Sequence, residues 1–595
     1  MEKTCFLATT ALEEFWDVEQ PMLFLGQWCL LYDRSSYWAH LDGYRVENHE
    51  VGSDELHARY HQDNKIYERI LPVVAQALNA IHETRHSDRY WRIVIGPWLQ
   101  TYVAAVHDRF RRIVKVLEAE PALTTCLLSS DSFVVPLDTR EFTLRLTEDS
   151  YNLQIYSKIF LFLGKKFSSK TYQQTKSSSY SIVGPRSTKQ KLFAFATGVA
   201  RSLVKKTALN PVVISNSYLS KISEIKLAFA FRGKVFSTTG MVAESQQLGY
   251  DKNKRKALEV VSFGEDDFSK CLASLLFSDV PKCFIEGYEA ALDAGRRKYP
   301  NSPKFIFSAN SWWYDETFKC WAAAQASRGI PLLGTPHGHY CVRLDQPSRK
   351  HEIDIVDRYY PWSSFFGTAL VERRAEVTSM PATKFMNIEN LGASNNLAGV
   401  LWVTTVVSRY SAFELPFSSA ELFENYLLWH ERFVDSLSKE SLLAIRFRPH
   451  PLDFGWSVVA RIRSHHPDIV LDNHRDFLES LSQCRLYVCD HLSTTFAEAI
   501  AANKPTILFW STEANKMLPQ AQKYFELLRD VGVFFSTPEE AAAAVNNHYA
   551  DVESWWNEPR RQDAVSIFRE ELCRTSPNAL SAWIEELQKF DTKDA

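Results

Sequence analysis

Short apolar runs recur along the last third of the chain, and stretches whose apolar residues have helical spacing lie between them. The runs that we interpret as strands include 400–405 (VLWVTT), 485–490 (RLYVCD) and 505–510 (PTILFW). Between the last two, 496–504 (FAEAIAANK) has the pattern of a helix. Continuous apolar runs are typical of strands buried on both faces of a parallel sheet. The alternation therefore predicts an α/β fold.

Earlier parts of the chain carry the same two signals. We expect strands at 4–9, 21–29, 304–310 and 330–340, and helices at 65–82 and 316–329, the second ended by Gly329. The aromatic-rich stretch 89–114 is expected to break at Gly96 and Pro97. Near the end, Leu580, Trp583, Ile584 and Leu587 have the spacing of a terminal helix.

Composition narrows the class of protein. The 595 residues are 45% hydrophobic and 23% charged, which fits a globular protein of more than one domain. A net charge of −3 without a basic stripe gives no sign of a nucleic-acid partner. The ten cysteines lack paired spacing, and there is no signal peptide and no apolar run of about 18 residues. We therefore expect a cytoplasmic protein. Peripheral association with the cytoplasmic face of the inner membrane is compatible with this expectation.

Two motifs about forty residues apart indicate a phosphate site. The strand that contains Ile445 and Phe447 leads directly into Arg448, His450 and Pro451, and the strand 485–490 leads into a hydroxyl run at a helix start, Ser493, Thr494 and Thr495. Ligands of open α/β sheets bind at the carboxyl ends of strands, and free N–H groups at a helix start attract anions. We expect a clamp for a nucleotide phosphate at the tips of neighbouring strands; a Ser/Thr run can also be an ordinary helix cap.

A second pair of strand ends carries acid–base residues. The strand 304–310 delivers Asn310, Asp315 and Glu316, and the strand 330–340 delivers His337, Gly338 and His339. Carboxylates and imidazoles at adjacent strand tips suit proton transfer. The alternative is that Asp315 or Glu316 only caps the following helix.

The segment His82-Glu83-Thr84-Arg85-His86 matches the H-E-x-x-H spacing of zinc proteases. Ser87 and Asp88 indicate a helix end directly afterwards, and His107 and Glu118, the nearest candidates for a third ligand, fit surface positions. We therefore predict no metal site.

A His-Pro pair followed by a Ser/Thr pair resembles the donor-binding signature of bacterial GT-B transferases that use CMP-activated sugars, such as sialyltransferases and Kdo transferases. The resemblance assigns His450, Pro451, Ser493, Thr494 and Thr495 to the CMP moiety. Glu498 resembles the acidic residue that many GT-B enzymes direct at the donor ribose.

A wider resemblance covers nearly the whole chain. The stretches LFLGQWC, RYWRIVIGPWL, ETFKCWAA, PHGHY, DRYYPW and FRPHP, in this order, are similar to a bacterial family of transferases of surface-polysaccharide loci. Its members often carry Gln-His-Gly where this chain has Pro336-His337-Gly338, so the role of that Gln does not transfer here.

The resemblance implies a GT-B-like fold of two facing Rossmann-like domains with a C-terminal helix that crosses back. We place an acceptor and catalytic domain at 1–390, a nucleotide-sugar domain at 391–555, and helices that return to the first domain at 556–595. The expected partners are a CMP-activated sugar and a glycan or glycolipid acceptor, without a cofactor.

The implied reaction transfers a 2-keto sugar acid of the Kdo or nonulosonate type. Arg448, His450 and the hydroxyl run would stabilise the departing CMP, and Asp315 would act as base or nucleophile, with His337 orienting or protonating. Lys319 or Arg343 would bind the sugar carboxylate, and retention or inversion stays open. Three further carboxylates are candidates for the catalytic role: Glu13, Glu14 and Asp17. A CDP-polyol phosphotransferase, a transferase of another nucleotide sugar and a non-catalytic glycan-assembly protein are the alternatives.

Overall fold

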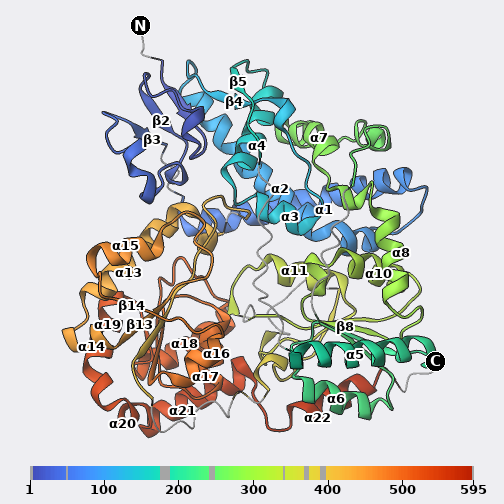
Figure 1. Ribbon diagram of the computed structural model, residues 1–595, viewed down its shortest axis with the longest axis vertical. Coiled ribbons are helices and arrows are strands. Elements are labelled where there is room, and N and C mark those ends of the chain that lie inside the picture. Colours follow the sequence, from blue (N-terminus) through green and yellow to red (C-terminus); the bar gives the residue numbers. More distant parts are fainter. Residues whose placement is uncertain are drawn as a thin grey trace.

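The computed structural model describes residues 4–47, 51–174, 188–239, 248–338, 342–366, 374–386, 388, 397–413 and 415–591. Figure 1 shows three lobes: an upper lobe built mainly from the first third of the chain, and two lower lobes that each contain a parallel sheet. The sheets of the lower lobes are the two facing Rossmann-like units that the sequence predicts.

The first Rossmann-like unit has six parallel strands in the order β11-β10-β9-β8-β6-β7. Because β6 and β7 precede the other four in sequence, the order reverses between β6 and β8. The strands of this sheet are β6 (Val212–Ser215), β7 (Val235–Thr238), β8 (Ile306–Ser308), β9 (Leu332–Gly334), β10 (Arg358–Tyr359) and β11 (Glu376–Val377). Its helices are α5 (Thr188–Thr207), α6 (Lys221–Ala230), α8 (Tyr288–Lys298), α9 (Ser311–Tyr314), α10 (Glu316–Ala326) and α11 (Pro347–Ile355).

The second Rossmann-like unit has the strand order β14-β13-β12-β15-β16-β17, which is the 3-2-1-4-5-6 order of dinucleotide-binding domains. Its strands are β12 (Val400–Val403), β13 (Ile445–Arg448), β14 (Val470–Leu471), β15 (Leu486–Cys489), β16 (Thr506–Phe509) and β17 (Phe534–Phe535). Its helices are α13 (Ala420–Asp435), α14 (Lys439–Ala444), α15 (Val458–His465), α16 (Phe477–Gln483), α17 (Thr494–Ala501), α18 (Pro519–Asp530) and α19 (Pro538–His548).

Helix α22 (Ala579–Gln588) crosses back to the first unit, as the predicted fold requires. The preceding helices, α20 (Val552–Trp556) and α21 (Pro559–Phe568), stay with the second unit, where Arg561 of α21 donates to the Val531 carbonyl after α18. Trp583 and Leu587 of α22 are buried against the first sheet, and the Trp583 indole N–H donates to the Pro381 carbonyl at 2.8 Å. Glu586 forms an ion pair with Arg358 at 3.0 Å. The chain end therefore covers one face of the first Rossmann-like sheet, beyond the second unit that precedes it in sequence (Figure 1).

The strands expected at 4–9 and 21–29 belong to a separate small parallel sheet in the upper lobe. It consists of β1 (Phe6–Ala8), β2 (Met22–Phe24) and β3 (Arg45–Val46), and β4 (Cys126–Leu128) pairs with β5 (Ser168–Lys170) beside it. A bridge between Phe6 and Thr124 joins the two parts. The helices of this lobe are α1 (Ser53–Ile81), α2 (Asp88–Ala119), α3 (Thr139–Arg145), α4 (Asp149–Phe162) and α7 (Asp267–Asp279).

Helix α2 runs through Gly96 and Pro97 without a break, so the expected interruption is wrong. Gly96 has a packing reason: a Cβ there would lie 2.8 Å from the imidazole of His351 on α11. The glycine lets α11 approach α2 closely. Most residues of α2 are buried, and this packing keeps the helix continuous despite the proline. His107, expected at the surface, is buried on α2 with its Nδ1 2.6 Å from Asp63.

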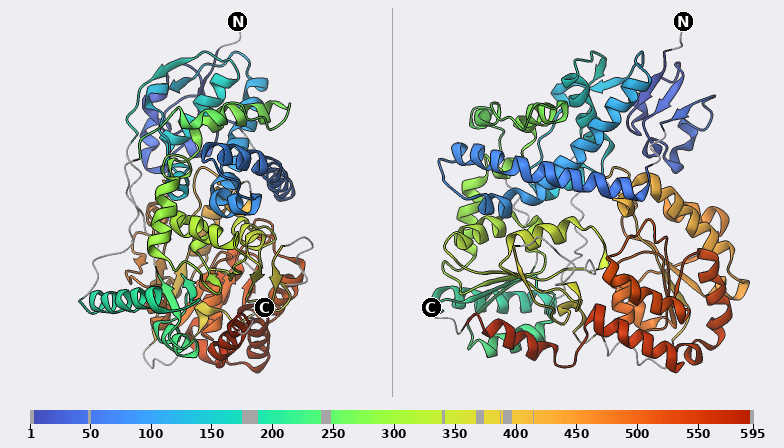
Figure 2. Two further views of the ribbon diagram at one scale, coloured as in Figure 1. Left: turned by 90° about the vertical axis from the view of Figure 1, so that its right-hand side faces the viewer. Right: turned by 180° about the vertical axis from the view of Figure 1, so that it is seen from behind.

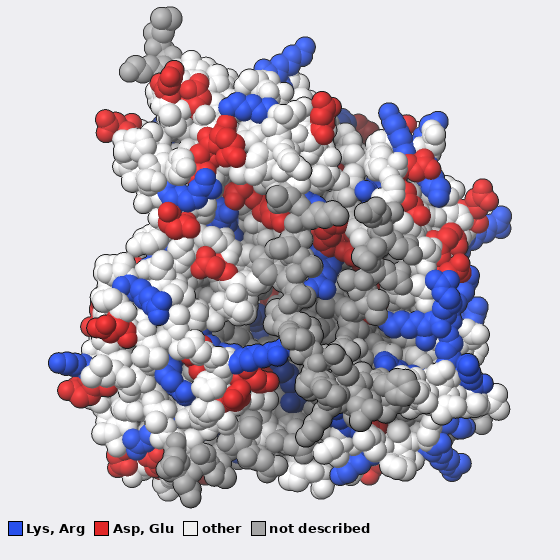
Figure 3. Space-filling model, in the orientation of Figure 1, with Lys and Arg blue, Asp and Glu red and all other residues white. Residues whose placement is uncertain are grey.

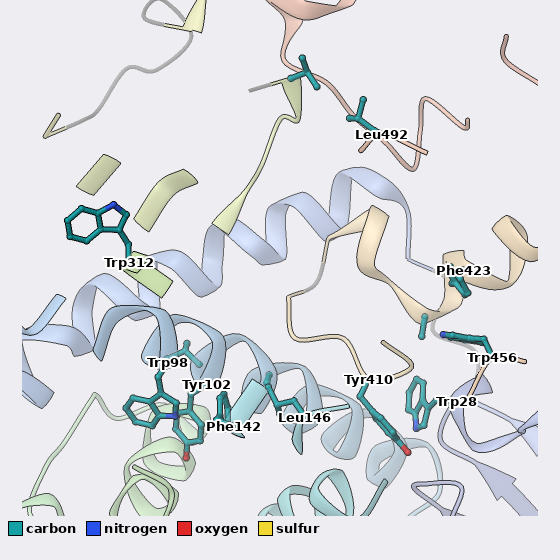
Figure 4. Packing of buried hydrophobic residues seen from close by; sticks show 14 of the residues in the cluster. Trp28, Trp98, Tyr102, Phe142, Leu146, Trp312, Tyr410, Phe423, Trp456 and Leu492 are labelled. Atoms are coloured by element: carbon teal, nitrogen blue, oxygen red, sulfur yellow. The ribbon is translucent and has the colours of Figure 1, made fainter. Parts of the chain in front are cut away.

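The upper lobe rests on both lower lobes. Helix α1 crosses above them in Figure 2, and its first residue, Ser53, donates to the Glu513 carbonyl at 2.9 Å. Aromatic residues of both parts, Trp28, Tyr410, Phe423 and Trp456, meet at the junction with the second unit (Figure 4). There the Arg409 guanidinium pairs with Asp149 at 2.5 Å and donates to the Trp28 carbonyl.

The two Rossmann-like units also contact each other through backbone hydrogen bonds. The segment 342–344, which follows β9, pairs antiparallel with 516–518, which follows β16. Leu344 N–H donates to the Lys516 carbonyl at 3.0 Å, and Leu518 N–H donates to the Val342 carbonyl at 2.8 Å. This backbone pairing lies beside the strand ends that carry the predicted site residues.

Candidate functional site

The carboxyl ends of both sheets carry the polar residues that the sequence singles out. The strand order reverses between β6 and β8 in the first sheet and between β12 and β15 in the second. Such reversal points are where open α/β sheets bind ligands, because the loops leave toward opposite faces and open a crevice. The candidate site therefore lies where these ends face each other.

The loop after β15 is built on a buried carboxylate. Asp490 accepts hydrogen bonds from the Trp402 indole at 2.9 Å and from the Tyr426 hydroxyl at 2.5 Å, and it lies 3.1 Å from His430. Burial acts to raise the pKa of Asp490, but His430 and His491 outweigh it and hold the pKa below its usual range. Asp490 therefore remains a fixed negative charge.

His491 follows Asp490 and bonds it through Nδ1 at 2.9 Å. Burial acts to lower the pKa of His491, but Cys489 and Asp490 outweigh it and raise the pKa to about 10. The imidazole is therefore a cation at neutral pH. The sequence analysis did not single it out, although a histidine between a strand end and a Ser/Thr helix start was a usable signal.

The predicted hydroxyl run lies directly beyond. Ser493, Thr494 and Thr495 are half-buried at the start of α17. The Ser493 and Thr495 hydroxyls lie 2.8 Å apart, and the Tyr487 hydroxyl donates to Thr495 at 2.9 Å. Ser493 makes no side-chain capping bond to the helix, so its hydroxyl is not used as an ordinary cap.

His450 and Pro451 are exposed at the end of β13. The His450 Nδ1 accepts from the Leu452 N–H at 3.1 Å, which leaves the Nε2 side of the ring directed outward. Desolvation lowers the pKa of His450, and the charge of His491 lowers it further, so the ring is neutral at pH 7. The two imidazoles thus lie within electrostatic reach of each other.

One expectation about this clamp is wrong. Strand β12 lies between β13 and β15, so the strands that carry His450 and Ser493 are not neighbours. Two strand spacings separate them by about 10 Å. A ligand held by both must span the end of β12.

Arg448 does not reach the crevice. Its guanidinium pairs with the buried Asp472 at 2.5 Å and donates to the Ser480 hydroxyl at 3.0 Å. These contacts use the arginine to join β13 to α16. Its role in phosphate binding has no support from this geometry.

A cavity of about 550 Å³ opens beside His491. Its lining includes the aromatic residues Tyr426, Trp429 and Trp510 and the basic residues Arg343 and His491. Arg343 comes from the first unit, where it follows His337 and Gly338 after β9. Its guanidinium lies 3.9 Å from the centre of the Phe417 ring and donates to the Leu492 carbonyl.

On the other side of the hydroxyl run, Glu498 is buried and its carboxylate lies 2.7 Å from the Lys384 ammonium. Burial raises the pKa of Glu498, and Lys384 opposes the rise. Lys384 also lies 5.7 Å from the ring of Tyr218, whose hydroxyl accepts from the Asn310 amide at 3.1 Å. Glu498 and Asn310, predicted on different units, are therefore joined through Lys384 and Tyr218.

The backbone after β6 is strained at this place. Asn216 and Tyr218 have φ of 46° and 59°, in the left-handed region that bulky side chains rarely adopt. Local strain of this kind is common at functional sites. It aims Tyr218 at the crevice, a residue that the sequence analysis missed.

The predicted carboxylates of the first sheet are internal. Asp315 is 1% exposed and caps α10 by accepting from the Phe318 N–H at 2.9 Å. Glu316 pairs with the fully buried Lys319 at 2.9 Å and accepts from the Thr139 N–H at 3.2 Å. These contacts match the helix-cap alternative, while the catalytic roles of Asp315 and Glu316 stay predictions. Glu13, one of the other candidate carboxylates, pairs with Arg34 in the upper lobe.

His337 is half-buried just beyond the end of β9. It follows β9, which pairs with β8 as expected, and Gly338 beside it is buried. The His337 Nδ1 lies 3.8 Å from the Glu352 carboxylate of α11, which also accepts from the Tyr359 hydroxyl at 3.0 Å. Burial raises the pKa of Glu352. His339 lies outside the described residues.

In the described part of the chain, no group of three His, Cys, Asp or Glu side chains could hold a metal ion. The H-E-x-x-H segment does not form one helix face, because α1 ends at Ile81 and Glu83 has a left-handed φ of 53°. Within the same described ranges, no helix has the length and apolar character needed to cross a membrane.

Comparison with known proteins gives one extensive match. The model of the LIC12162 family of transferases matches residues 5–587. No curated protein matches the chain.

Several solved structures resemble this one at low identity. The wall teichoic acid polymerase TagF, as its H548A variant, is 9% identical, with 68% of this chain and 97% of that chain covered at a TM-score of 0.32. The spinosyn forosaminyltransferase SpnP is 12% identical, with 64% and 99% covered at 0.32. The glycosyltransferase SnogD from Streptomyces nogalater is 13% identical, with 64% and 100% covered at 0.32. Similarities at these scores decide neither substrate nor mechanism.

Proposed function

The chain belongs to the LIC12162 family of transferases, and we propose that it is a GT-B glycosyltransferase that uses a CMP-activated donor. The transferred group is a 2-keto sugar acid of the Kdo or nonulosonate type. The acceptor is a cell-surface glycan or its lipid-linked precursor.

One observation carries the proposal: His491, held by the buried Asp490 at 2.9 Å, precedes the Ser493 hydroxyl run at the strand-order reversal of the second sheet. Departure of CMP leaves negative charge on its phosphate. A fixed cation and oriented hydroxyls in a half-buried site stabilise that charge more than water does, because they need no reorganisation. His450 binds the phosphate or ribose as a neutral hydrogen-bond donor through Nε2.

His337 is the best placed base for the acceptor. The Glu352 carboxylate lies 3.8 Å from its Nδ1, and the imidazole takes the proton of the acceptor hydroxyl. The acceptor oxygen forms a bond to the anomeric carbon while the bond from that carbon to the CMP phosphate oxygen breaks. The electron pair leaves with CMP, and a single displacement of this kind inverts the anomeric configuration.

The sugar carboxylate is assigned to Arg343. Of the two cations considered, Lys319 is fully buried and paired with Glu316, whereas Arg343 lines the 550 Å³ cavity together with His491. A planar guanidinium matches a carboxylate in two hydrogen bonds. The aromatic walls of the cavity suit the carbon faces of a sugar ring.

Calorimetric titration with CMP, CDP, UDP and GDP tests the donor class. Tighter binding of CMP supports the proposal, and CMP-activated ulosonic acids are then the substrates to assay. Tighter binding of CDP than CMP would favour the polyol phosphotransferase, and preference for UDP or GDP would favour another nucleotide sugar. Absence of binding to all four would favour a non-catalytic assembly protein.

A further inference from the structure

Helix α6 presents apolar side chains to solvent. Ile222, Ile225 and Phe229 are 68%, 50% and 80% exposed, and they recur at positions i, i+3 and i+7. Residues with this spacing form one stripe along a helix. The buried side of α6, with Ser223 and Leu227, packs toward the first sheet, so the apolar stripe lies on the opposite side.

Other segments at the same edge of the first sheet also expose apolar side chains. Helix α5 projects from the body of the molecule in the left view of Figure 2, and its Val199 and Leu203 are exposed. Leu209, between α5 and β6, is 81% exposed. Single exposed apolar residues are ordinary, but several large ones at one end of one sheet are typical of a binding surface.

The same segments are strongly basic, although the whole chain has a net charge of −3. Between residues 197 and 238, Glu224 is the one acidic residue, against seven basic ones: Arg201, Lys205, Lys206, Lys221, Lys226, Arg232 and Lys234. Lys and Arg also gather at the edge of the molecule beside α8 and α5 on the right of Figure 3.

Helices α5 and α6 flank the edge strand β7 from opposite faces of the first sheet. Val204 of α5 packs on the face that carries Val213 and Phe236, and Leu227 of α6 packs on the face that carries Val212 and Ile214. On α6 itself, Lys221 and Lys226 lie on either side of the apolar stripe, because they fall about 70° from its centre on a helix of 3.6 residues per turn. The apolar stripe of α6 therefore has basic residues along both of its sides.

We propose that the exposed side of α6 binds the surface of a membrane that contains anionic lipids. The apolar stripe of α6 enters the boundary between headgroups and acyl chains, and the surrounding Lys and Arg side chains contact anionic headgroups. A protein partner would be expected to present acidic groups at fixed positions, whereas the flexible Lys and Arg side chains here suit a fluid anionic layer.

The position of the face gives it a use that rests on the proposed function. Ile222 lies four residues after Tyr218, which contacts Asn310 and Lys384 in the crevice. A lipid-linked acceptor whose chain stays in the bilayer would present its headgroup sugar to the crevice from this side. Membrane binding itself needs no assumption about the reaction.

Co-sedimentation of the full chain with vesicles tests the proposal. We expect binding to vesicles of phosphatidylglycerol and phosphatidylethanolamine, and little binding to vesicles of phosphatidylcholine. The double variant Ile225→Glu, Phe229→Glu should lose at least about tenfold in affinity, because it places charge in the apolar boundary. Leu443→Glu is the matched control, since Leu443 is 73% exposed on α14 of the second unit.

A charge-reversal variant separates the two contributions. Lys221→Glu, Lys226→Glu should weaken binding by about fivefold or more per residue at low salt, with less effect at high salt. Equal binding by wild type and both double variants would overturn the proposal. So would a wild-type dimer in light scattering that the α6 variant converts to a monomer without any vesicle binding. CMP titration of the same samples keeps the outcome separate from that of the proposed function.

Discussion

The two six-stranded sheets end in different ways, although both bring parallel strands to one crevice. In the first sheet, Asp315, Glu316 and Lys319 are internal and serve as a helix cap and an ion pair. In the second, His450 and the Ser493 run remain accessible, and His491 is held as a cation by Asp490. The strand order supplies a crevice in both cases. The chemistry depends on which polar side chains stay accessible there instead of being buried as helix caps or ion pairs.

The largest effect is expected from His337, which follows β9 of the first sheet. His337→Ala should lower kcat by about 10²- to 10⁴-fold, the usual contribution of a general base. CMP affinity should not change, because His337 lies on the other unit. The measurement is steady-state turnover of a CMP-activated sugar acid together with CMP titration.

The matched variant for this test is Glu352→Gln, which keeps the size of the side chain and removes its charge. It should lower kcat less than His337→Ala, because it keeps the imidazole and removes only the charge that lies 3.8 Å from its Nδ1. Full activity of His337→Ala would remove the base assignment and return Asp315 to consideration.

Variants in the second sheet should change the affinity for CMP. His450→Ala is expected to weaken CMP binding by about 1.5 to 3 kcal/mol, the value of a hydrogen bond to a charged group. The control is His465→Ala at the exposed end of α15. Calorimetry that finds the two variants equal would show that the clamp does not include His450.

Arg343 tests whether the first sheet contributes a cation to the second. Arg343→Gln should weaken binding of the complete CMP-sugar acid by about 1.5 to 2 kcal/mol while CMP alone binds as before. Competition titration measures both. Equal weakening of CMP would mean that the loss of the Arg343 contact to the Leu492 carbonyl disturbs the phosphate loop instead.

The charge state of His491 gives a pH test. Its pKa of about 10 keeps the imidazolium present below that pH, so phosphate attraction should persist from pH 7 to about 9 and fall as the pH rises through about 10. CMP affinity that falls between pH 6 and 7.5 would indicate an ordinary histidine. The His491→Gln variant should bind weakly without this alkaline decrease.

The smallest effect concerns stability. If Asp315 is a helix cap, Asp315→Ala should lower the free energy of unfolding by about 1 to 2 kcal/mol and leave CMP binding near wild type. The comparison variant is Asp476→Ala, which removes an exposed cap that accepts from Leu478 N–H at 2.8 Å. Lost turnover with unchanged stability would instead favour the catalytic role.

Local patterns predicted much of this fold because they depend on neighbours in sequence. The apolar runs of the second unit, the helix that ends before Gly329 and the returning helix with Trp583 could all be read from spacing. The continuity of α2 through Pro97 could not, because it depends on packing around Gly96, where His351 approaches.

The candidate site likewise has features that the sequence could predict and features that depend on tertiary packing. His450 and Ser493 follow strands, and the sequence therefore places them at the carboxyl edge, but it cannot place β12 between them. Glu352 was missed because only tertiary packing brings α11 to His337. The ion pair of Arg448 with Asp472 was not visible in the sequence for the same reason, and the role of Arg448 at the phosphate stays a prediction.

The antiparallel pairing of 342–344 with 516–518 limits how far the two Rossmann-like units can move apart. Many two-lobed enzymes open and close as a hinge with one free side, and product leaves through the widened mouth. Here the lobes are fastened at this seam, across the top by α1 and across the bottom by α22. Large-scale opening of the two units would have to break several of these contacts together. We therefore expect substrate to enter and product to leave through movement of loops, while the two units keep their relative positions.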